Sequence, residues 1–506
     1  VNIITKKPTN RTLGFVEAGT GNLGLQRYSA GIKIPIVKDK LFFGLTGLYQ
    51  TRDGFYINDT TGTGATDGSI NGKKVGGVKN LYGNVFLKWL PSSRLMFTLN
   101  VKAQRDWSNN STYMINDAVG FADPDKLNLG RIGQDERNIF NNSLVVKYSG
   151  NEFTLTSISA YQNIRIGYKD IYFPGYYSSF YDKKPGELLP PQVVLSQEVR
   201  INSNTDKKLQ YTAGVYGFSQ KSHGGDNVYE LSESEAAAYG LPTGSFIISR
   251  NDGKNYGLAG FGELSYQLTD KFKATVGVRY DYENKQARFN GFGDAAFVNG
   301  EVTNFVADTT AKGHYSSLSP KLALSYAINM HSNVYATYNR GFRAGGINAQ
   351  RFTTATNAKQ TFDPEYSDNF EVGYKTSLAQ HKVSIAASAF LIKWKDMQLS
   401  NIVSPFTYAL ENVGNSQSLG IELEVSAIPV KGLQLDGSVG LNKTKYEDFA
   451  LTRVDYTTGE ESKTQLAGNS LSNTPSHTIY LGAQYELGIT KKLMAVIHGD
   501  IRNIGK

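Results

Sequence analysis

The stretch from Asn333 to Lys375 decides the fold: it opens as NVYATYNRGFRAGGIN (333–348) and, after a loop, resumes as YSDNFEVGYK (366–375). In both halves apolar or aromatic side chains occupy every second position, namely Val334, Ala336 and Tyr338 in the first and Phe370, Val372 and Tyr374 in the second. This alternation is the periodicity of a β-strand. The stretch therefore predicts a strand, a long loop and a second strand.

The same alternation recurs along the whole chain of 506 residues. It gives about nineteen strand candidates, among them Leu95 to Gln104, Phe272 to Glu283 and Leu433 to Leu441. No composition break separates them, which predicts one all-β domain. Alternation alone does not distinguish a soluble sandwich, with its apolar face in a core, from a membrane barrel with its apolar face toward lipid.

The connections between the candidate strands alternate between short and long. Pro91 to Ser93 and Asn329 to Ser332 are short, whereas Ser108 to Asp135 and Phe342 to Asp363 are long. Short turns at one end and long loops at the other are typical of outer-membrane barrels. Compact soluble domains seldom have many loops longer than a dozen residues. The pattern thus favours a transmembrane antiparallel β-barrel.

Composition excludes several other classes. Mean hydropathy is −0.35, and no apolar run approaches the ~18 residues of a membrane-spanning helix. The net charge of +8 is dispersed along the chain, which argues against a nucleic-acid-binding arm. Cysteine is absent, which excludes disulfides and thiol chemistry. A strand-pair spacing of roughly 55 residues suggests a soluble β-propeller as an alternative, but three glycine doublets are too few to mark its blades.

Several segments, in this order, resemble TonB-dependent outer-membrane receptors. They are VNIITKKP (1–8), LFFGLTGLYQTRDGF (41–55), YATYNRGFRAGG (335–346), FDPEYSDNFEVGYKTSL (362–378) and NVGNSQSLGIELE (412–424). The resemblance implies a 22-stranded barrel in the bacterial outer membrane, closed by an N-terminal plug. We therefore expect residues 1–8 to be the end of the plug and residues 9–506 an incomplete barrel, cut at both ends, since nineteen strands fall short of 22.

The resemblance also implies a function. We expect a receptor that imports a scarce ligand, with a ferric siderophore favoured, driven by proton-motive force through the TonB-ExbB-ExbD complex acting on the plug. Outer-membrane lipid and lipopolysaccharide would surround the barrel. Uptake of a carbohydrate or other non-iron ligand, a passive porin, and a soluble propeller-like binding protein are the alternatives.

The sequence gives little indication of catalysis, cofactor binding or metal binding. GTGNLG (19–24) matches a dinucleotide-binding motif, but the alternating residues after it predict a strand, so we interpret it as a hairpin turn. The six histidines are dispersed, and no metal site is expected. The sequence predicts no catalytic residues, no cofactor and no enzyme activity.

Two loop features are candidates for ligand binding. Aromatic side chains cluster in YKDIYFPGYYSSFY (168–181), in a predicted external loop, and we single out Tyr172, Phe173, Tyr176, Tyr177 and Tyr181. Their rings would stack on a ligand or, alternatively, belong to an interfacial aromatic girdle.

The second candidate is Arg343, in a segment that resembles the F-R-A-P box of haem receptors. Gly345 stands where that box has proline, and no histidine lies between Arg343 and Glu365, so the usual haem ligand is missing. Arg343 would either contact the ligand or anchor the base of the loop.

Overall fold

The computed structural model describes most of the chain. The described residues are 8–59, 70–109, 122–173, 176–181, 188–204, 207–238, 240–290, 295–298, 301–304, 309–348, 359–404, 407–454, 461–490 and 493–505. Residues 1–7, and with them most of the expected plug segment, lie outside this set.

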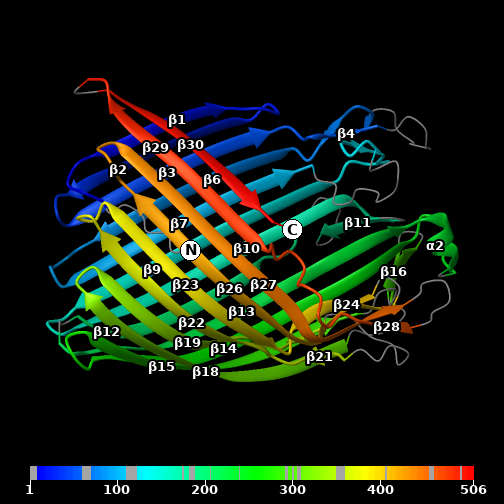
Figure 1. Ribbon diagram of the computed structural model, residues 1–506. Coiled ribbons are helices and arrows are strands. Elements are labelled where there is room, and N and C mark those ends of the chain that lie inside the picture. Colours follow the sequence, from blue (N-terminus) through cyan, green and yellow to red (C-terminus); the bar gives the residue numbers. More distant parts are fainter. Residues whose placement is uncertain are drawn as a thin grey trace.

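One large sheet dominates the molecule (Figure 1). Within the described residues, nineteen long strands each pair antiparallel with the next along the chain. They are β1 (Leu13–Thr20), β2 (Gln26–Val37), β3 (Leu41–Arg52), β6 (Val78–Trp89), β7 (Leu95–Ser108), β9 (Gln134–Ser149), β10 (Phe153–Phe173), β12 (Gln192–Ser203), β13 (Leu209–Leu231), β14 (Phe246–Gln267), β15 (Phe272–Phe289), β18 (Thr309–Asn329), β19 (Ser332–Arg343), β22 (Glu365–Leu378), β23 (Val383–Lys395), β26 (Gly414–Ala427), β27 (Leu433–Val454), β29 (His477–Gly488) and β30 (Met494–Ile504). The predicted strand number is confirmed, and the continuous ladder excludes a propeller of separate blades.

The sheet curves into a barrel with unlike ends (Figure 1). Short turns gather at one end, and the long connections with their own small elements lie at the other, which we call the loop end. The small elements are β4 (Tyr56–Asn58), β5 (Lys74–Val75), β8 (Lys126–Leu127), β11 (Tyr176–Tyr181), α2 (Glu233–Ala238), β16 (Ala295–Val298), β17 (Glu301–Asn304), β20 (Gly346–Ile347), β21 (Thr361–Phe362), β24 (Gln398–Ser404), β25 (Thr407–Asn412) and β28 (Glu461–Gln465). Among the described helical residues, none forms a helix long and apolar enough to cross a bilayer.

The apolar side chains of the strands point outward and are exposed. On β15, Val276, Val278 and Tyr280 expose 52%, 48% and 52% of their surface. The alternate positions carry polar side chains such as Arg279 and Asp281, whose side chains pair at 2.7 Å. A soluble sandwich would bury the apolar face. The exposed apolar face therefore favours the membrane barrel, with an apolar surface toward lipid and a polar lumen.

Two local predictions have clear outcomes. The GTGNLG segment covers the end of β1 and the hairpin turn to β2, where Leu23 and Gly24 have φ values of 56° and 61°, so the turn prediction is confirmed. The long connection was expected to begin at Phe342, but β19 continues to Arg343 because Phe342 and Arg343 still pair with β22.

Candidate functional site

The aromatic segment lies in the long connection between β10 and β12, and part of that connection is ordered as strands. Its backbone forms a hairpin, in which the end of β10 pairs with β11 so that Tyr172 lies opposite Tyr177 and Phe173 opposite Tyr176. Strand β11, which ends at Tyr181, pairs on its other edge with β13. Aromatic residues favour strands, which the loop assignment overlooked. The side chains of all five candidates lie outside the described part of the structure, so their contact with a ligand stays a prediction.

Arg343 lies at the mouth of the barrel. It is the last residue of β19, directly opposite Glu365, the first residue of β22. Its Nε lies 2.9 Å from Glu365 Oε1, and the exposed fractions of the two side chains are 56% and 5%. A buried carboxylate thus holds a guanidinium that remains half exposed. The structure does not bring Arg343 together with the aromatic hairpin in any recorded contact among described residues.

Gln398, the first residue of β24, joins three chain segments around Arg343. Its Oε1 accepts from Arg343 Nε at 2.8 Å, and its Nε2 donates to the carbonyl oxygens of Ala344 (3.1 Å) and Asp363 (2.9 Å). Its backbone N–H donates to Glu365 Oε2 at 2.6 Å. We call Arg343, Glu365 and Gln398 the mouth junction. Because Gln398 is buried, these bonds hold the loop base in one arrangement.

A second set of contacts fastens the segment that follows Arg343. Lys285 Nζ donates to the carbonyl oxygen of Gly345, and the Tyr315 hydroxyl donates to that of Gly346, both at 2.8 Å. Lys285 also lies 3.4 Å from Glu283 and 5.7 Å from the centre of the Tyr315 ring. The loop is therefore tied to β15 and β18 on one side and to β24 on the other.

An ion-pair cluster at the loop end joins the segment before β9 to β10 and β13. Arg131 Nη2 donates to Glu230 Oε1 at 2.9 Å, a second bond joins Arg131 Nη1 to Glu230, and Asp170 lies 3.4 Å away. The hydrogen bonds with Glu230, followed by the charge of the two carboxylates, raise the pKa of Arg131 above its ordinary value. The Arg131 guanidinium therefore stays charged throughout the physiological pH range.

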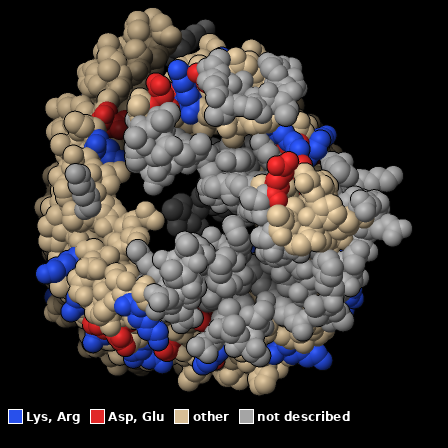
Figure 2. All heavy atoms as spheres, turned by 90° about the vertical axis from the view of Figure 1, so that its right-hand side faces the viewer, with Lys and Arg blue, Asp and Glu red and all other residues tan. Residues whose placement is uncertain are grey.

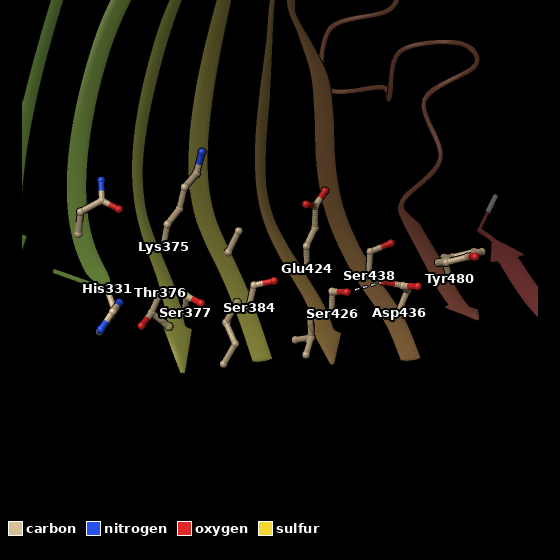
Figure 3. A pocket seen from close by; sticks show the side chains of 15 residues that line it. His331, Lys375, Thr376, Ser377, Ser384, Glu424, Ser426, Asp436, Ser438 and Tyr480 are labelled. Carbon is tan, nitrogen blue, oxygen red and sulfur yellow. Dashed lines mark hydrogen bonds between the residues drawn. The ribbon is translucent and has the colours of Figure 1, made fainter. Parts of the chain in front are cut away.

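The loop end carries charges of both signs around a central hollow (Figure 2). Deeper in the barrel, the polar wall has a depression of ≈ 530 Å³. Its lining includes Lys375, Glu424, Asp436 and Tyr480, which project from neighbouring strands (Figure 3). Ser426 donates to Asp436 at 2.7 Å. Such a wall suits a hydrated lumen or a polar protein segment packed inside it.

Sequence reasoning found Arg343 but missed its partners. Glu365 and Gln398 lie 22 and 55 residues further along the chain, in segments whose local pattern gives no functional signal. Strand pairing places Glu365 opposite Arg343, and hydrogen bonds join Gln398 to both residues. Among the described residues, no group of three or more histidine, aspartate or glutamate side chains is arranged to hold a metal ion.

Comparison with known proteins agrees with this architecture. Residues 91–495 match the family model described as "TonB dependent receptor-like, beta-barrel". The chain is 25% identical over 444 residues to the pesticin receptor of Yersinia enterocolitica, covering 84% of this chain and 57% of that protein. It is 24% identical over 249 residues to a probable TonB-dependent siderophore receptor, PiuA, of Acinetobacter baumannii, covering 47% and 31% of the two chains.

Solved structures show the same fold. The ferric yersiniabactin uptake receptor FyuA from Yersinia pestis superimposes with a TM-score of 0.78 at 19% identity, covering 99% of this chain and 70% of that one. The siderophore receptor PiuA from Acinetobacter baumannii gives 0.69 at 13% identity, covering 97% and 71%. The chain spans 57% of the length of the pesticin receptor that it matches.

Proposed function

The chain belongs to the TonB-dependent receptor-like β-barrel family of outer-membrane receptors, and from this premise we propose that it forms the barrel of a receptor that imports a ferric siderophore. Proteins of this family are transport receptors and not enzymes. The names of relatives support the ligand class, since they include a probable siderophore receptor and a ferric yersiniabactin uptake receptor.

The observation that carries the proposal is the half-exposed guanidinium of Arg343, held in place at the lumen mouth by Glu365 and Gln398. Arginine suits anionic oxygen atoms because its planar donors match carboxylates and similar groups. Ferric siderophores carry such oxygens around the iron. We propose that Arg343 contacts the ligand and that Tyr172, Phe173, Tyr176, Tyr177 and Tyr181 supply an aromatic surface beside it.

Energy coupling is the second part of the proposal. We propose that residues 1–8 lead from a plug into the barrel formed by residues 9–506, and that the TonB-ExbB-ExbD complex acts on that plug. The polar lumen wall around Lys375, Glu424 and Asp436 supports this arrangement because it offers charged partners to a protein segment inside the barrel.

The test is growth under iron limitation. A strain that lacks the gene is supplied with individual ferric siderophores, and growth is compared with strains that carry the wild-type gene or the Arg343→Ala variant. We expect the wild-type gene to restore growth on one siderophore or one chemical class. A rescue by a carbohydrate as sole carbon source, with no siderophore dependence, would replace the siderophore proposal.

A passive porin is separated from this proposal by its energy requirement. Import through a TonB-coupled receptor stops when a protonophore collapses the proton-motive force, whereas diffusion through a porin continues. Uptake of radiolabelled ⁵⁵Fe-siderophore is measured before and after the protonophore is added. Uptake that persists unchanged would support the porin.

A further inference from the structure

The outward face of five adjacent strands changes character toward the loop end. Strand register places directly opposed residues of β19, β22, β23, β26 and β27 in rows on this face. Two successive rows are wholly apolar or aromatic: Val334, Tyr374, Ala387, Leu423 and Val439, then Ala336, Val372, Ala389, Ile421 and Leu441. Val372 and Ile421 expose 57% and 53% of their surface. These rows belong to the lipid-facing belt.

The next rows toward the loop end introduce charge. The third row reads Tyr338, Phe370, Leu391, Leu419 and Lys443, and the fourth reads Arg340, Asp368, Lys393, Gln417 and Lys445. Four strand spacings of about 4.8 Å make each row about 19 Å wide. A polar row that wide, directly above the belt, lies where lipid head groups begin.

The charges in these rows are predominantly positive. We define the outer basic patch as Arg340, Lys393, Lys443 and Lys445 from these rows, together with Lys395, which lies opposite Tyr366 one row closer to the loop end. Asp368 is bonded to Arg340 at 2.8 Å and lies 3.5 Å from Lys395. The amide of Gln417 lies 3.0 Å from Glu447 and 3.1 Å from Lys445. Five cations thus face two carboxylates, and Lys393 and Lys443 are exposed.

The lumen face of the same strands has the opposite bias. Its charges include Glu371, Glu422, Glu424 and Asp436, with Lys375 among them. The basic character of the outer face is therefore local and does not follow from the net charge of the chain. Rows of ammonium groups beside a membrane surface attract phosphate groups.

We propose that the outer basic patch binds the head group of a phosphorylated glycolipid in the outer leaflet, the class to which lipopolysaccharide belongs. Its acyl chains would lie along the belt beneath, beside Leu419 and Ile421, while its phosphates approach Lys393 and Lys443. The inference goes beyond import, since it depends on the barrel wall and not on which ligand the lumen receives.

The test uses the full-length protein, purified in neutral detergent and titrated with bisphosphorylated lipid A. In the variant Lys393→Gln/Lys443→Gln we expect affinity to fall about 25-fold, because each lysine beside an anionic lipid surface contributes about fivefold. The charge-reversal variant Lys393→Glu/Lys443→Glu should lose more. The matched control is Lys382→Gln/Lys431→Gln, which alters exposed lysines in the short turns at the other end of the same strands.

Two further probes identify the lipid group that is recognised. Dephosphorylated lipid A should bind the wild-type protein as weakly as lipid A binds the glutamine variant, and phosphatidylglycerol should bind more weakly than lipid A. Folding of each variant is checked by its heat-dependent migration on gels. If the glutamate variant is misfolded, the test rests on the glutamine variant.

Several results would overturn the proposal. These are equal affinity of the glutamine variant and its control, binding that is independent of phosphate, or phosphatidylglycerol binding as tightly as lipid A. Siderophore-dependent growth is measured in parallel. If the wild-type gene does not restore siderophore-dependent growth, the import proposal is refuted, but the lipid-binding result is unaffected.

Discussion

Replacing Arg343 with alanine tests the mouth junction directly. The substitution removes the guanidinium that lies 2.9 Å from Glu365 and donates to Gln398 at 2.8 Å. Glu365 would then be a buried carboxylate, with only 5% of its side chain exposed, without its countercharge. The hydrogen bond from the Gln398 backbone N–H to this carboxylate would remain. The lost stabilisation therefore concerns the Glu365 carboxylate.

The magnitude follows from burial. Removing one partner of a buried ion pair costs about 3–5 kcal/mol. Because Arg343 itself is 56% exposed, water screens part of the interaction. We expect the junction to lose about 2 kcal/mol, which raises the population of its open form roughly 30-fold.

Hydrogen exchange of the Gln398 amide measures this opening. In Arg343→Ala the amide should exchange roughly 30-fold faster than in the wild type. The double variant Arg343→Ala/Glu365→Gln should recover most of the protection, because a neutral amide is less costly to bury than a charge. Unchanged exchange in the single variant, or equally fast exchange in both variants, would refute the view that Glu365 needs Arg343 as its countercharge.

Three more predictions address the belt and the loops. Val278→Arg puts a charge on the exposed apolar face and should lower the free energy of unfolding by about 2–4 kcal/mol, measured by urea denaturation in micelles, whereas Ser388→Arg on the lumen face should cost far less. Asn58→Ala removes the side chain that accepts from the Leu129 N–H at 2.8 Å and donates to the Leu129 carbonyl at 3.1 Å. The Leu129 amide should exchange faster by the equivalent of about 1–3 kcal/mol. Unchanged exchange would contradict the view that Asn58 holds the backbone at Leu129. Gly345→Ala places a Cβ 2.3 Å from the Phe362 carbonyl oxygen and should loosen this part of the loop. The Asn348 amide, which donates to the Gln360 carbonyl at 2.8 Å, should then exchange faster than in the wild type. The control is Gly83→Ala, where the added Cβ meets nothing within 4 Å and the exchange of Asn348 should not change.

The barrel is largely predictable from sequence because its determinants are local. Alternation in segments such as Phe272 to Glu283 requires only the two-residue period of a strand, and turn length requires only the spacing between strands. Which face meets lipid is not local information. It follows from the curvature of the sheet, which leaves Val276 and Val278 exposed on the outside.

The mouth junction was beyond prediction for the same reason. Gln398 contacts Arg343 across 55 residues of sequence, and the segment around it carries no motif that indicates this contact. In the aromatic hairpin the strand structure within the long connection was missed: the backbones of Tyr172 and Tyr177 pair in register, and aromatic residues favour strands.

The departure of Gly345 from the F-R-A-P pattern now has a physical reason. A Cβ at this position would lie 2.3 Å from the carbonyl oxygen of Phe362 and 2.4 Å from the ring of Tyr315. Proline carries a Cβ, so it meets the same obstruction. Glycine lets the chain pass close enough for Lys285 to reach the Gly345 carbonyl and for Tyr315 to reach the next one. The residue that separates this segment from the haem-receptor box is thus required by the way the loop is fastened to the barrel wall.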